Sequence, residues 1–536
     1  MWHDPAAHIH GQRAMSPFPE QLHALLYRRA YPHPARTVDL IETHISWVLL
    51  TGKIAYKIKR PVHYSFIDLR EPAQRRRLCH EEVRLNRRFA PELYLGVRAV
   101  RRWHGEAHMG GSGRIIEHAV GMRQFPRSHE LDALLARRRI VPAALENFGR
   151  ELAELHARLP KARPRRRWGQ PAAQVEGVRG NAAECARAAE AMGKATATAV
   201  RAVQARLELW AGAAQPLLER RFADGRVREC HGDLHAGNIV RHGARLMPFD
   251  CLEFDPALRW IDVADEVSFL LTDLEARERP LHAQAFLGGY LSASGDYQAC
   301  LLLPLFRAHR ALVRAKVMAL TATASGTTGA AARNARRLHA RYVECAQRAL
   351  APQRPKLVLM SGVSGSGKTW MARRLAPALH AVHLRSDIER KRLAGLSSLA
   401  RSASALAQGL YARDVTRAVY DRLAECATDA LAGGLTTIVD ATFGLARDRA
   451  RFRALAARLG LDTWIVYCHA GRKVLEARMR KRHRAATDPS EADIGVLNWQ
   501  AAHFTAPATQ EGVTVLDAAE VAPRELARRI SAAAPR

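Results

Sequence analysis

Cysteine is scarce in this sequence, and its few copies are scattered. Eight cysteines occur among 536 residues, with no CxxC pair and no spacing typical of metal ligands. This pattern argues against a disulfide framework and against a structural zinc site. We therefore expect reduced, buried thiols in a cytoplasmic protein.

Long apolar runs are missing as well. No stretch approaches the roughly 20 apolar residues that a membrane-spanning helix needs. The first twenty residues, MWHDPAAHIHGQRAMSPFPE, contain no apolar core of a secretory signal. We expect no membrane partner, and we expect residues 1–15 to form a flexible tail.

Acidic residues are in deficit. The chain has 83 Lys and Arg against 52 Asp and Glu, a formal net charge of +31, and the basic residues are spread along its length. Aromatic residues make up only 6%, and no aromatic-studded platform for single-stranded nucleic acid is visible. The charge favours anionic ligands such as nucleotides, while nucleic acid is a possible partner but not a favoured one.

The length predicts more than one domain, because a chain of this size exceeds a single core. Residues 45–62 alternate around Thr51-Gly52 and predict a β-hairpin. A helical pattern follows from Glu71 to about Pro91, and strand-like runs follow at 93–100 and 114–125. These elements together predict a small α+β lobe.

The region from about 130 to 345 is mostly helical in pattern. Residues 160–180, rich in Arg and Pro, predict a basic loop before an Ala-rich helix over 181–222. Two prolines and two basic residues at 349–356 precede a new apolar strand. We predict a domain over 16–348, a linker over 349–356 and a second domain over 357–536.

Two neighbouring segments carry a pattern suited to phosphoryl transfer. HGDLHAGNIV (231–240) places Asp233 five residues before Asn238, and LMPFDCLEFD (246–255) places Asp250 at the end of an apolar strand. An acid, an amide and a second acid at adjacent strand ends can converge on one point. Such a cluster can orient an acceptor hydroxyl with one carboxylate and hold Mg²⁺ with the other two groups.

These two segments resemble the catalytic and metal-binding loops of aminoglycoside phosphotransferases and their relatives, which share the protein-kinase fold. The resemblance implies that Asp233 is the catalytic base and that Asn238 and Asp250 bind magnesium. From the residues themselves, we expect His231 to brace the loop rather than to perform chemistry. RWIDVADEVSFL, further along, is similar to the same family, and we expect Asp262 to hold the catalytic loop.

The same resemblance implies a strand lysine that binds the ATP phosphates and pairs with a helix glutamate. AYKIK offers Lys57 and Lys59 on one face of a strand, and HEEV offers Glu81 and Glu82. We favour Lys57 with Glu82, and the choice between the two acids stays open at this point.

A second phosphate-binding signature occurs at 362–369, GVSGSGKT, between an apolar strand and an amphipathic helix. Glycines let backbone N–H groups surround phosphates, the lysine reaches the β- and γ-phosphates, and the threonine ligates Mg²⁺. The predicted ATP-binding residues are Gly362, Val363, Ser364, Gly365, Ser366, Gly367, Lys368 and Thr369.

The alternation of strands and helices after 357 predicts a parallel sheet with helices on both faces. The arrangement resembles small P-loop kinases of the polynucleotide-, gluconate- and shikimate-kinase type. The resemblance implies that Asp387 orients the acceptor hydroxyl, that Arg390 binds the acceptor, and that an arginine within 478–484 belongs to a mobile lid. Asp440 is either an acid near the magnesium or a strand-end cap.

The whole chain resembles a bacterial group that fuses these two modules and is often labelled as AAA-family ATPases. A ring ATPase fits poorly, because no convincing Walker B motif is visible. Our leading hypothesis is a two-domain enzyme that uses ATP and Mg²⁺ to phosphorylate a hydroxyl of an unknown small molecule. The alternatives are an ATP-binding regulator with one non-catalytic site and a polynucleotide 5′-hydroxyl kinase.

Overall fold

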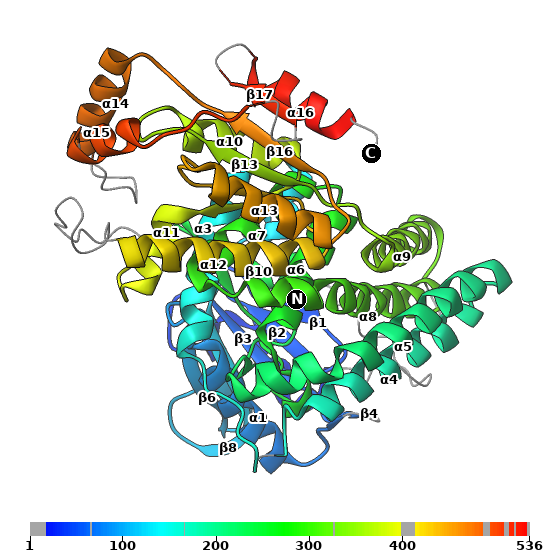
Figure 1. Ribbon diagram of the computed structural model, residues 1–536. Coiled ribbons are helices and arrows are strands. Elements are labelled where there is room, and N and C mark those ends of the chain that lie inside the picture. Colours follow the sequence, from blue (N-terminus) through cyan, green and yellow to red (C-terminus); the bar gives the residue numbers. More distant parts are fainter. Residues whose placement is uncertain are drawn as a thin grey trace. The chain divides into compact units, whose positions relative to one another are not determined.

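The computed structural model describes residues 18–64, 67–165, 167–324, 327–397, 413–485, 494–508, 514–518 and 521–532. The predicted tail over 1–15 lies outside these residues. The chain divides into two compact units. The first unit comprises residues 1–144, 158–279 and 305–350, and the second comprises 145–157, 280–304 and 351–536. Each unit is described by itself below (Figure 1).

An antiparallel six-stranded sheet opens the first unit, with strand order β1-β2-β3-β8-β6-β7. The hairpin predicted around Thr51-Gly52 is confirmed, because β2 and β3 pair antiparallel on either side of it. The structure adds the short strands β1 and β7, whose mixed polar and apolar residues gave no clear alternation. The strands are β1 (Asp39–Glu42), β2 (Ser46–Leu50), β3 (Ile54–Lys59), β6 (Tyr94–Trp103), β7 (Glu106–Met109) and β8 (Arg114–Arg123).

Helix α1 (Pro72–Asn86) packs against strands β6 and β8 of this sheet. Pro72 occupies its first turn, where a missing N–H costs nothing. The buried face of α1 carries apolar residues such as Leu78 and Val83, and also Glu82, which is fully buried. A buried carboxylate requires a partner, and β3 supplies it, as described below. A two-stranded hairpin, β4 (His63–Tyr64) with β5 (Ile67–Asp68), precedes α1.

The rest of the first unit is mainly helical. The expectation of a basic loop over 160–180 is wrong in its second half, because α4 already begins at Pro171. Gly193, with φ of +113°, separates α4 from α5, so the predicted single helix is two. The helices are α2 (Leu131–Ala136), α4 (Pro171–Glu190), α5 (Lys194–Ala223), α6 (Val263–Ala276), α8 (Leu303–Thr323) and α9 (Gly329–Leu350).

Two small strand pairs frame the segment that carries the predicted catalytic residues. β9 (Val227–Glu229) pairs with β12 (Trp260–Asp262), and β10 (Ile239–His242) pairs with β11 (Arg245–Pro248). Residues 230–238 therefore connect β9 to β10, and residue 250 follows β11. This topology brings the two predicted loops to the same end of the β10–β11 hairpin.

The second unit contains the expected parallel sheet, with strand order β14-β15-β13-β16-β17. The unit also includes most of α3 (Pro142–Arg158) and all of α7 (Pro280–Ser294). Its strands are β13 (Leu357–Ser361), β14 (Val382–Arg385), β15 (Thr437–Asp440), β16 (Thr463–Tyr467) and β17 (Thr514–Asp517). Its other helices are α10 (Lys368–Ala378), α11 (Ser386–Leu393), α12 (Arg413–Ala432), α13 (Ala446–Arg458), α14 (Arg472–Ala485), α15 (Ile494–Ala502) and α16 (Pro523–Ala532).

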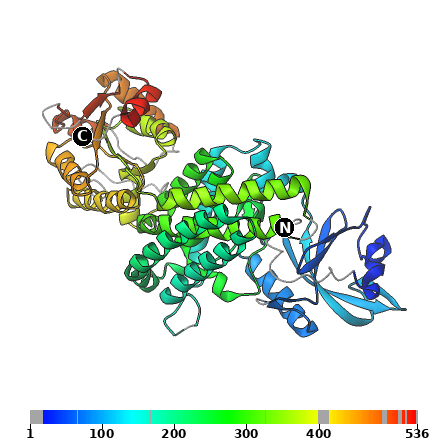
Figure 2. The ribbon, with the colours of Figure 1, turned by 90° about the vertical axis from the view of Figure 1, so that its right-hand side faces the viewer.

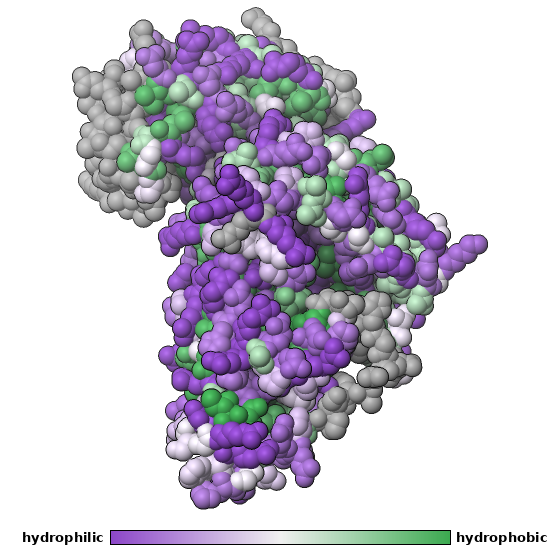
Figure 3. All heavy atoms as spheres, turned by 90° about the horizontal axis from the view of Figure 1, so that it is seen from below, coloured by the Kyte–Doolittle hydropathy of each residue, from purple (hydrophilic) through white to green (hydrophobic). Residues whose placement is uncertain are grey.

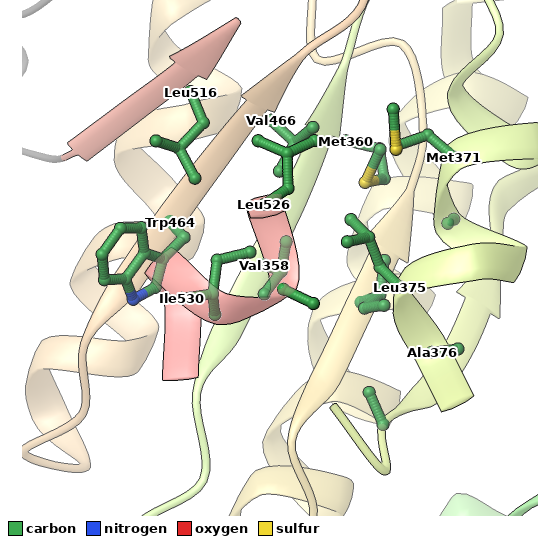
Figure 4. Close-up of a cluster of buried hydrophobic side chains, with 14 of the residues drawn as sticks. Val358, Met360, Met371, Leu375, Ala376, Trp464, Val466, Leu516, Leu526 and Ile530 are labelled. Atoms are coloured by element: carbon green, nitrogen blue, oxygen red, sulfur yellow. The ribbon is translucent and has the colours of Figure 1, made fainter. Parts of the chain in front are cut away.

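One face of the parallel sheet packs against α10 and α16 (Figures 1, 2 and 4). Alternate residues of each strand point to this face, so Val358 and Met360 of β13 lie beside Trp464 and Val466 of β16. Leu526 of α16 is fully buried among them. The near-continuous apolar strands are typical of a parallel sheet covered on both faces.

Most charged residues lie at the surface. Hydrophilic residues dominate the face drawn in Figure 3, where hydrophobic residues form small separate patches. Among the described residues, no helix combines the length and the hydropathy that a membrane span requires.

Replacing Leu526 with Ala should destabilise the second unit by about 2–5 kcal/mol, because the truncation leaves a cavity between α16 and the sheet. Leu459→Ala, at a position that is 37% exposed, should cost no more than about 0.5 kcal/mol. The difference in stability between the two variants is measured by urea unfolding, with hydrogen exchange of β13 and β16 as the readout. Equal losses in the two variants would contradict the assignment of this core.

Candidate active sites

A buried ion-pair network joins strand β3 to helix α1. The ammonium Nζ of Lys57 lies 3.0 Å from Oε1 of Glu82 and 2.8 Å from Oδ1 of Asp250. Burial alone would lower the pKa of Lys57, but Asp250 and Glu82 hold it well above its usual range. Lys57 is therefore a charged donor next to the loop after β11. The structure brings together these three predicted residues, and it pairs Glu82 rather than Glu81 with the strand lysine.

Lys59 extends the same network. It points to the same face of β3 as Lys57, and its Nζ lies 2.5 Å from Oε2 of Glu82. It also contacts Glu253, three residues after Asp250. No sequence motif predicts a role for Glu253. The segment FDCLEFD holds three acids, and their spacing alone does not show that Glu253 would pair with a lysine.

The predicted base and the predicted amide ligand are directly hydrogen-bonded. Asn238 donates its Nδ2 to the backbone oxygen of Asp233 at 3.0 Å and to its Oδ2 at 2.8 Å. The amide nitrogen is thereby used, so the amide oxygen is the atom that remains for a cation. The Asp233 side chain is 29% exposed, which leaves its carboxylate accessible to an acceptor.

Two basic residues that we had not singled out sit near Asp233. His235 accepts a hydrogen bond from Gly237 N–H at its Nδ1, so its Nε2 carries the proton and faces Oδ2 of Asp233 at 3.5 Å. Burial alone would raise the pKa of Asp233, but His235 and Arg314 hold it well below its usual range. Asp233 is therefore ionised at neutral pH. A carboxylate with such a low pKa orients a hydroxyl better than it removes a proton from it.

Asp250 adopts a left-handed backbone conformation, with φ of +65°. Asp tolerates this region better than most residues. Its N–H donates to the hydroxyl of Tyr94, a buried residue of β6. This hydrogen bond fixes the backbone that carries the carboxylate.

The loop that bears Asp233 is held mainly by α6. Glu266 accepts the N–H groups of His231 and Gly232 at 2.7 and 3.0 Å, and Asp273 accepts the N–H of Ala236. His231 is fully buried; its Nε2 lies 2.9 Å from the oxygen of Phe249. The geometry fits the bracing role that we expected for His231.

Asp262 has a different position from the one we expected. It pairs with the buried Arg221 through two contacts of 2.8 Å and accepts Ala264 N–H at the start of α6. It therefore caps the helix that holds the loop, whereas Glu266 and Asp273 contact the loop itself. A sequence motif shows only where the acids lie along the chain. Which group each acid contacts depends on the direction in which its side chain leaves α6.

The groups at this site suit a magnesium ion. Asn238 and Asp250 offer an amide oxygen and a carboxylate, and magnesium prefers such hard oxygen ligands. Asp250 is 24% exposed, so its carboxylate can meet both Lys57 and a ligand.

The phosphate-binding loop of the second unit follows β13 directly. Gly362, with φ of +147°, cannot be replaced, because a Cβ there would lie 2.1 Å from the oxygen of Cys468. Gly367, with φ of +103°, begins α10. The hydroxyl of Ser366 is buried and makes no hydrogen bond within the described residues. An unpaired polar atom in a loop of this kind is suited to a phosphate oxygen.

Thr369 and Asp440 meet at the end of the sheet. The Thr369 hydroxyl donates to Oδ2 of Asp440 at 2.6 Å, and His383 lies 3.1 Å from the same oxygen. Burial alone would raise the pKa of Asp440, but His383, Arg385 and Lys368 hold it well below its usual range. The oxygen of Thr369 keeps lone pairs for a cation.

This contact bears on the two roles that the sequence left open for Asp440. TIVD, the strand β15, ends in an acid that occupies the position of a Walker B aspartate beside the phosphate-binding loop. We had seen no convincing motif because Ala441 follows, where a ring ATPase carries a second acid. The geometry therefore favours a magnesium-linked acid over a simple strand cap.

Two residues from α14 and α15 contact the loop. Arg478 lies 3.3 Å from the backbone oxygens of Gly365 and Ser366, and Gln500 accepts the N–H of Ser364 at 2.8 Å. Arg478 is the member of the predicted lid cluster that the structure places at the loop. The side chains of Arg482 and Arg484 lie outside the description. Sequence gave no signal for Gln500, which is more than a hundred residues away.

Asp387 and Arg390 lie in α11, directly after β14. Asp387 is half-buried and makes no hydrogen bond or ion pair with another described residue, so its carboxylate can receive a hydroxyl. Arg390 is buried and lies 3.3 Å from the hydroxyl of Thr416 on α12. Lys368 contacts the backbone oxygen of Val363 at 3.0 Å. The structure thus places both predicted acceptor residues at the carboxyl end of the sheet, although no direct contact joins them to the phosphate-binding loop.

The stability of the first unit should depend on the protonation of His231. Burial lowers the pKa of His231 to about 4, against about 6.5 for an unfolded histidine. Between these values only the unfolded chain binds the proton, so the free energy of unfolding falls as the pH drops from 6.5 to 4, by about 3 kcal/mol. Above pH 6.5 this contribution is constant.

The difference in free energy of unfolding between wild type and His231→Gln should therefore become smaller as the pH falls from 6.5 to 4, because only wild type loses the contribution of His231. Hydrogen exchange of β10 and β11 at a series of pH values measures it. His242→Gln, at an exposed position of β10, is the matched control and should keep the wild-type slope. A constant difference between wild type and His231→Gln would show that His231 does not titrate in this way.

Two protein-family models match separate parts of the chain. The family described as "Phosphotransferase enzyme family" matches residues 61–303, and an "AAA domain" family matches residues 357–507. A choline kinase from Cryptosporidium parvum covers 58% of this chain and 89% of its own, at 10% identity and a TM-score of 0.37. A gluconokinase from Sinorhizobium meliloti covers 33% of this chain and 90% of its own, at 20% identity and a TM-score of 0.24.

The similarity to two mycobacterial proteins extends over both units. Uncharacterized proteins of Mycobacterium tuberculosis and Mycobacterium bovis are 31% identical over 427 residues, which is 80% of this chain and 82% of theirs. The chain therefore belongs to the family of these mycobacterial proteins, and it joins a phosphotransferase-family domain to an AAA-type P-loop kinase domain.

Proposed function

We propose that the chain is a magnesium-dependent phosphotransferase with two sites, each of which moves the γ-phosphate of ATP to a hydroxyl of a small molecule. The observation that carries this proposal is the cluster in the first unit. Lys57, Glu82 and Asp250 form one connected network, and Asp233 is hydrogen-bonded to Asn238. These are the charges that phosphoryl transfer to an alcohol requires.

In the first site, the ammonium of Lys57 is fixed by Glu82 and would contact the α- and β-phosphates. Asn238 and Asp250 would hold magnesium, which neutralises charge on the transferred phosphoryl group. Asp233 accepts a hydrogen bond from the acceptor hydroxyl and holds its oxygen in line with the γ-phosphorus. Because the transition state is loose, the hydroxyl proton moves late, when the bond from oxygen to phosphorus is already forming and the proton is acidic enough for the Asp233 carboxylate to accept it.

In the second site, the backbone of 362–369 and the start of α10 surround the phosphates. Lys368 and Arg478 would supply positive charge to the β- and γ-phosphates. Thr369, oriented by Asp440, would hold magnesium. Asp387 would orient the acceptor hydroxyl, and closure of α14 and α15 would exclude water from the reaction.

Replacement of Asp233 by Asn should lower phosphoryl transfer at the first site by a factor of about 10²–10⁴, with little effect on the second. Lys368→Ala should lower transfer at the second site by about 100-fold or more, because it removes the main cation of that loop. The measurement is transfer of labelled γ-phosphate to pools of metabolites and oligonucleotides. Each single variant should lose one set of labelled products, and the double variant should lose both.

The matched controls are Asp224→Asn, at an exposed position at the end of α5, and Lys473→Ala, at an exposed position of α14. Both should behave as wild type. If all variants label the same products, the two assignments fail. Labelled oligonucleotides that vanish with Lys368→Ala would instead identify a polynucleotide kinase.

Replacement of Glu82 by Gln should lower kcat/KM for ATP at the first site by about 10- to 100-fold, because Lys57 and Lys59 lose the carboxylate that orients them. Glu117→Gln removes another buried acid, which pairs with Arg75 in the same lobe and lies outside the site. Steady-state kinetics with wild type and both variants tests the role. A similar loss of kcat/KM in both variants would show that Glu82 has a purely structural role.

A further inference from the structure

A cavity of about 740 Å³ lies in the first unit. None of its lining residues belongs to the Asp233 cluster or to the phosphate-binding loop. It opens between α1, the loop before α4 and the segment around β12. Its lining residues are Arg84, Pro160, Lys161, Ala162, Arg163, Trp168, Glu229, Pro256, Arg259 and Trp260.

The lining is strongly basic. Glu229 is buried, and its carboxylate is already compensated by Arg84, Arg88 and Arg259, which lie 2.9 to 3.2 Å away. Lys161 and Arg163 are exposed and make no ion pair with any described residue. The lining therefore carries a surplus of positive charge that no acid of the described chain balances.

Part of the lining is aromatic. Trp260 is 9% exposed and packs with Ala162 and Val227, and Trp168 lies half-buried against this cluster. An apolar wall next to free cations is suited to a ligand that combines a flat ring with an anionic group. The volume lies within the range of 300–1,000 Å³ that is typical of small-molecule sites.

We propose that this cavity binds a small phosphate monoester with an aromatic or heterocyclic body, as an effector of the first site. Lys161, Arg163 and the exposed part of Arg84 bind the phosphate, and the ring packs on Trp168 and Trp260. The class includes nucleoside monophosphates, among other ring phosphates.

Arg259 connects the cavity to the first site. Its guanidinium lies 2.8 Å from Glu81, the neighbour of Glu82 on α1. It also donates to the backbone oxygens of Leu252 and Glu253, which follow Asp250. Arg84, which contacts the ligand, pairs with the same two acids as Arg259, Glu81 and Glu229. A phosphate bound at Arg84 therefore acts, through these shared acids, on both elements that hold Lys57. This effect rests on the proposed function, whereas the binding does not.

The binding test is calorimetry of the full chain with 1-naphthyl phosphate, inorganic phosphate and 1-naphthol as probes. The first should bind more tightly than either of the others. The double variant Lys161→Ala, Arg163→Ala should bind naphthyl phosphate about tenfold or more weakly than wild type. The matched control removes one arginine and one lysine from exposed positions of α4 and α5, Arg179→Ala with Lys194→Ala, and should bind as wild type.

A second variant, Trp168→Leu, should bring the affinity for naphthyl phosphate close to that for inorganic phosphate. Binding to the phosphate-binding loop would persist in all these variants, so it cannot mimic the result. The proposal is overturned if naphthyl phosphate does not bind, or if it binds equally to wild type and to the Lys161, Arg163 double variant.

The effector role has its own readout. Naphthyl phosphate should change hydrogen exchange of α1 and of residues 252–260 in wild type, and not in the double variant. Unchanged exchange in α1 despite saturable binding would overturn the effector role. Exchange is measured without ATP turnover, so failure of the proposed enzymatic function would not alter this outcome.

Discussion

A carboxylate placed between two buried lysines organises the first unit. Glu82 is fully buried, and such a charge is tolerated only when it is paired and hydrogen-bonded. Lys57 and Lys59 pair with it from β3, and Asp250 and Glu253 complete the balance from the loop after β11. Removing one member would leave the others uncompensated, which costs about 3–5 kcal/mol. The sheet, α1 and this loop are therefore held in one arrangement.

The same requirement explains why α6 carries so many acids. Asp265, Glu266 and Asp273 are buried on one short helix, and each meets a donor that positions the catalytic loop or its support. Glu266 and Asp273 accept loop N–H groups, while Asp265 pairs with Arg310, which also lies 3.2 Å from the oxygen of Gly232. The loop thus depends on backbone contacts to a rigid helix, and Asp233 remains accessible at its tip. The second site depends instead on its own backbone, with Asp440 as its main side-chain support.

Both folds could be predicted from the sequence because each rests on local patterns. The alternation around Thr51-Gly52 predicts the hairpin of the first sheet, and the apolar strand before Gly362 predicts the start of the second. Neither prediction needs information about residues that are distant in the sequence. Residues within one motif, such as Asp233 and Asn238, also came together as their spacing suggested.

Contacts that depend on the third dimension could not be predicted. Glu81 and Glu82 are adjacent in sequence, and a rotation of about 100° along α1 decides which one is buried. Asp262 was assigned to the loop although it caps α6. The role of Gln500 depends on where α15 returns to the sheet, and no local pattern contains that information. The first ten residues of α4, from Pro171, were predicted to be loop, because the Arg- and Pro-rich segment directly before them is typical of a loop.

The acceptor side of the second site is constrained by the same rule of paired charge. Glu389 of α11 is fully buried, and Arg392 and Arg422 lie 3.2 and 3.5 Å from it. Arg392 also donates to the backbone oxygen of Ala293 at 2.9 Å, and Arg422 donates to that of Gly295 at 2.6 Å, at the end of α7.

Separating α11 from α7 would therefore expose a buried acid and two helix-end carbonyls at once. Arg478 and Gln500, by contrast, contact the phosphate-binding loop through a few bonds on the partly exposed helices α14 and α15. Closure around a substrate thus costs least when α14 and α15 move toward α11. In the proposed reaction, Asp387 and Arg390 would then form the fixed wall against which the acceptor is held.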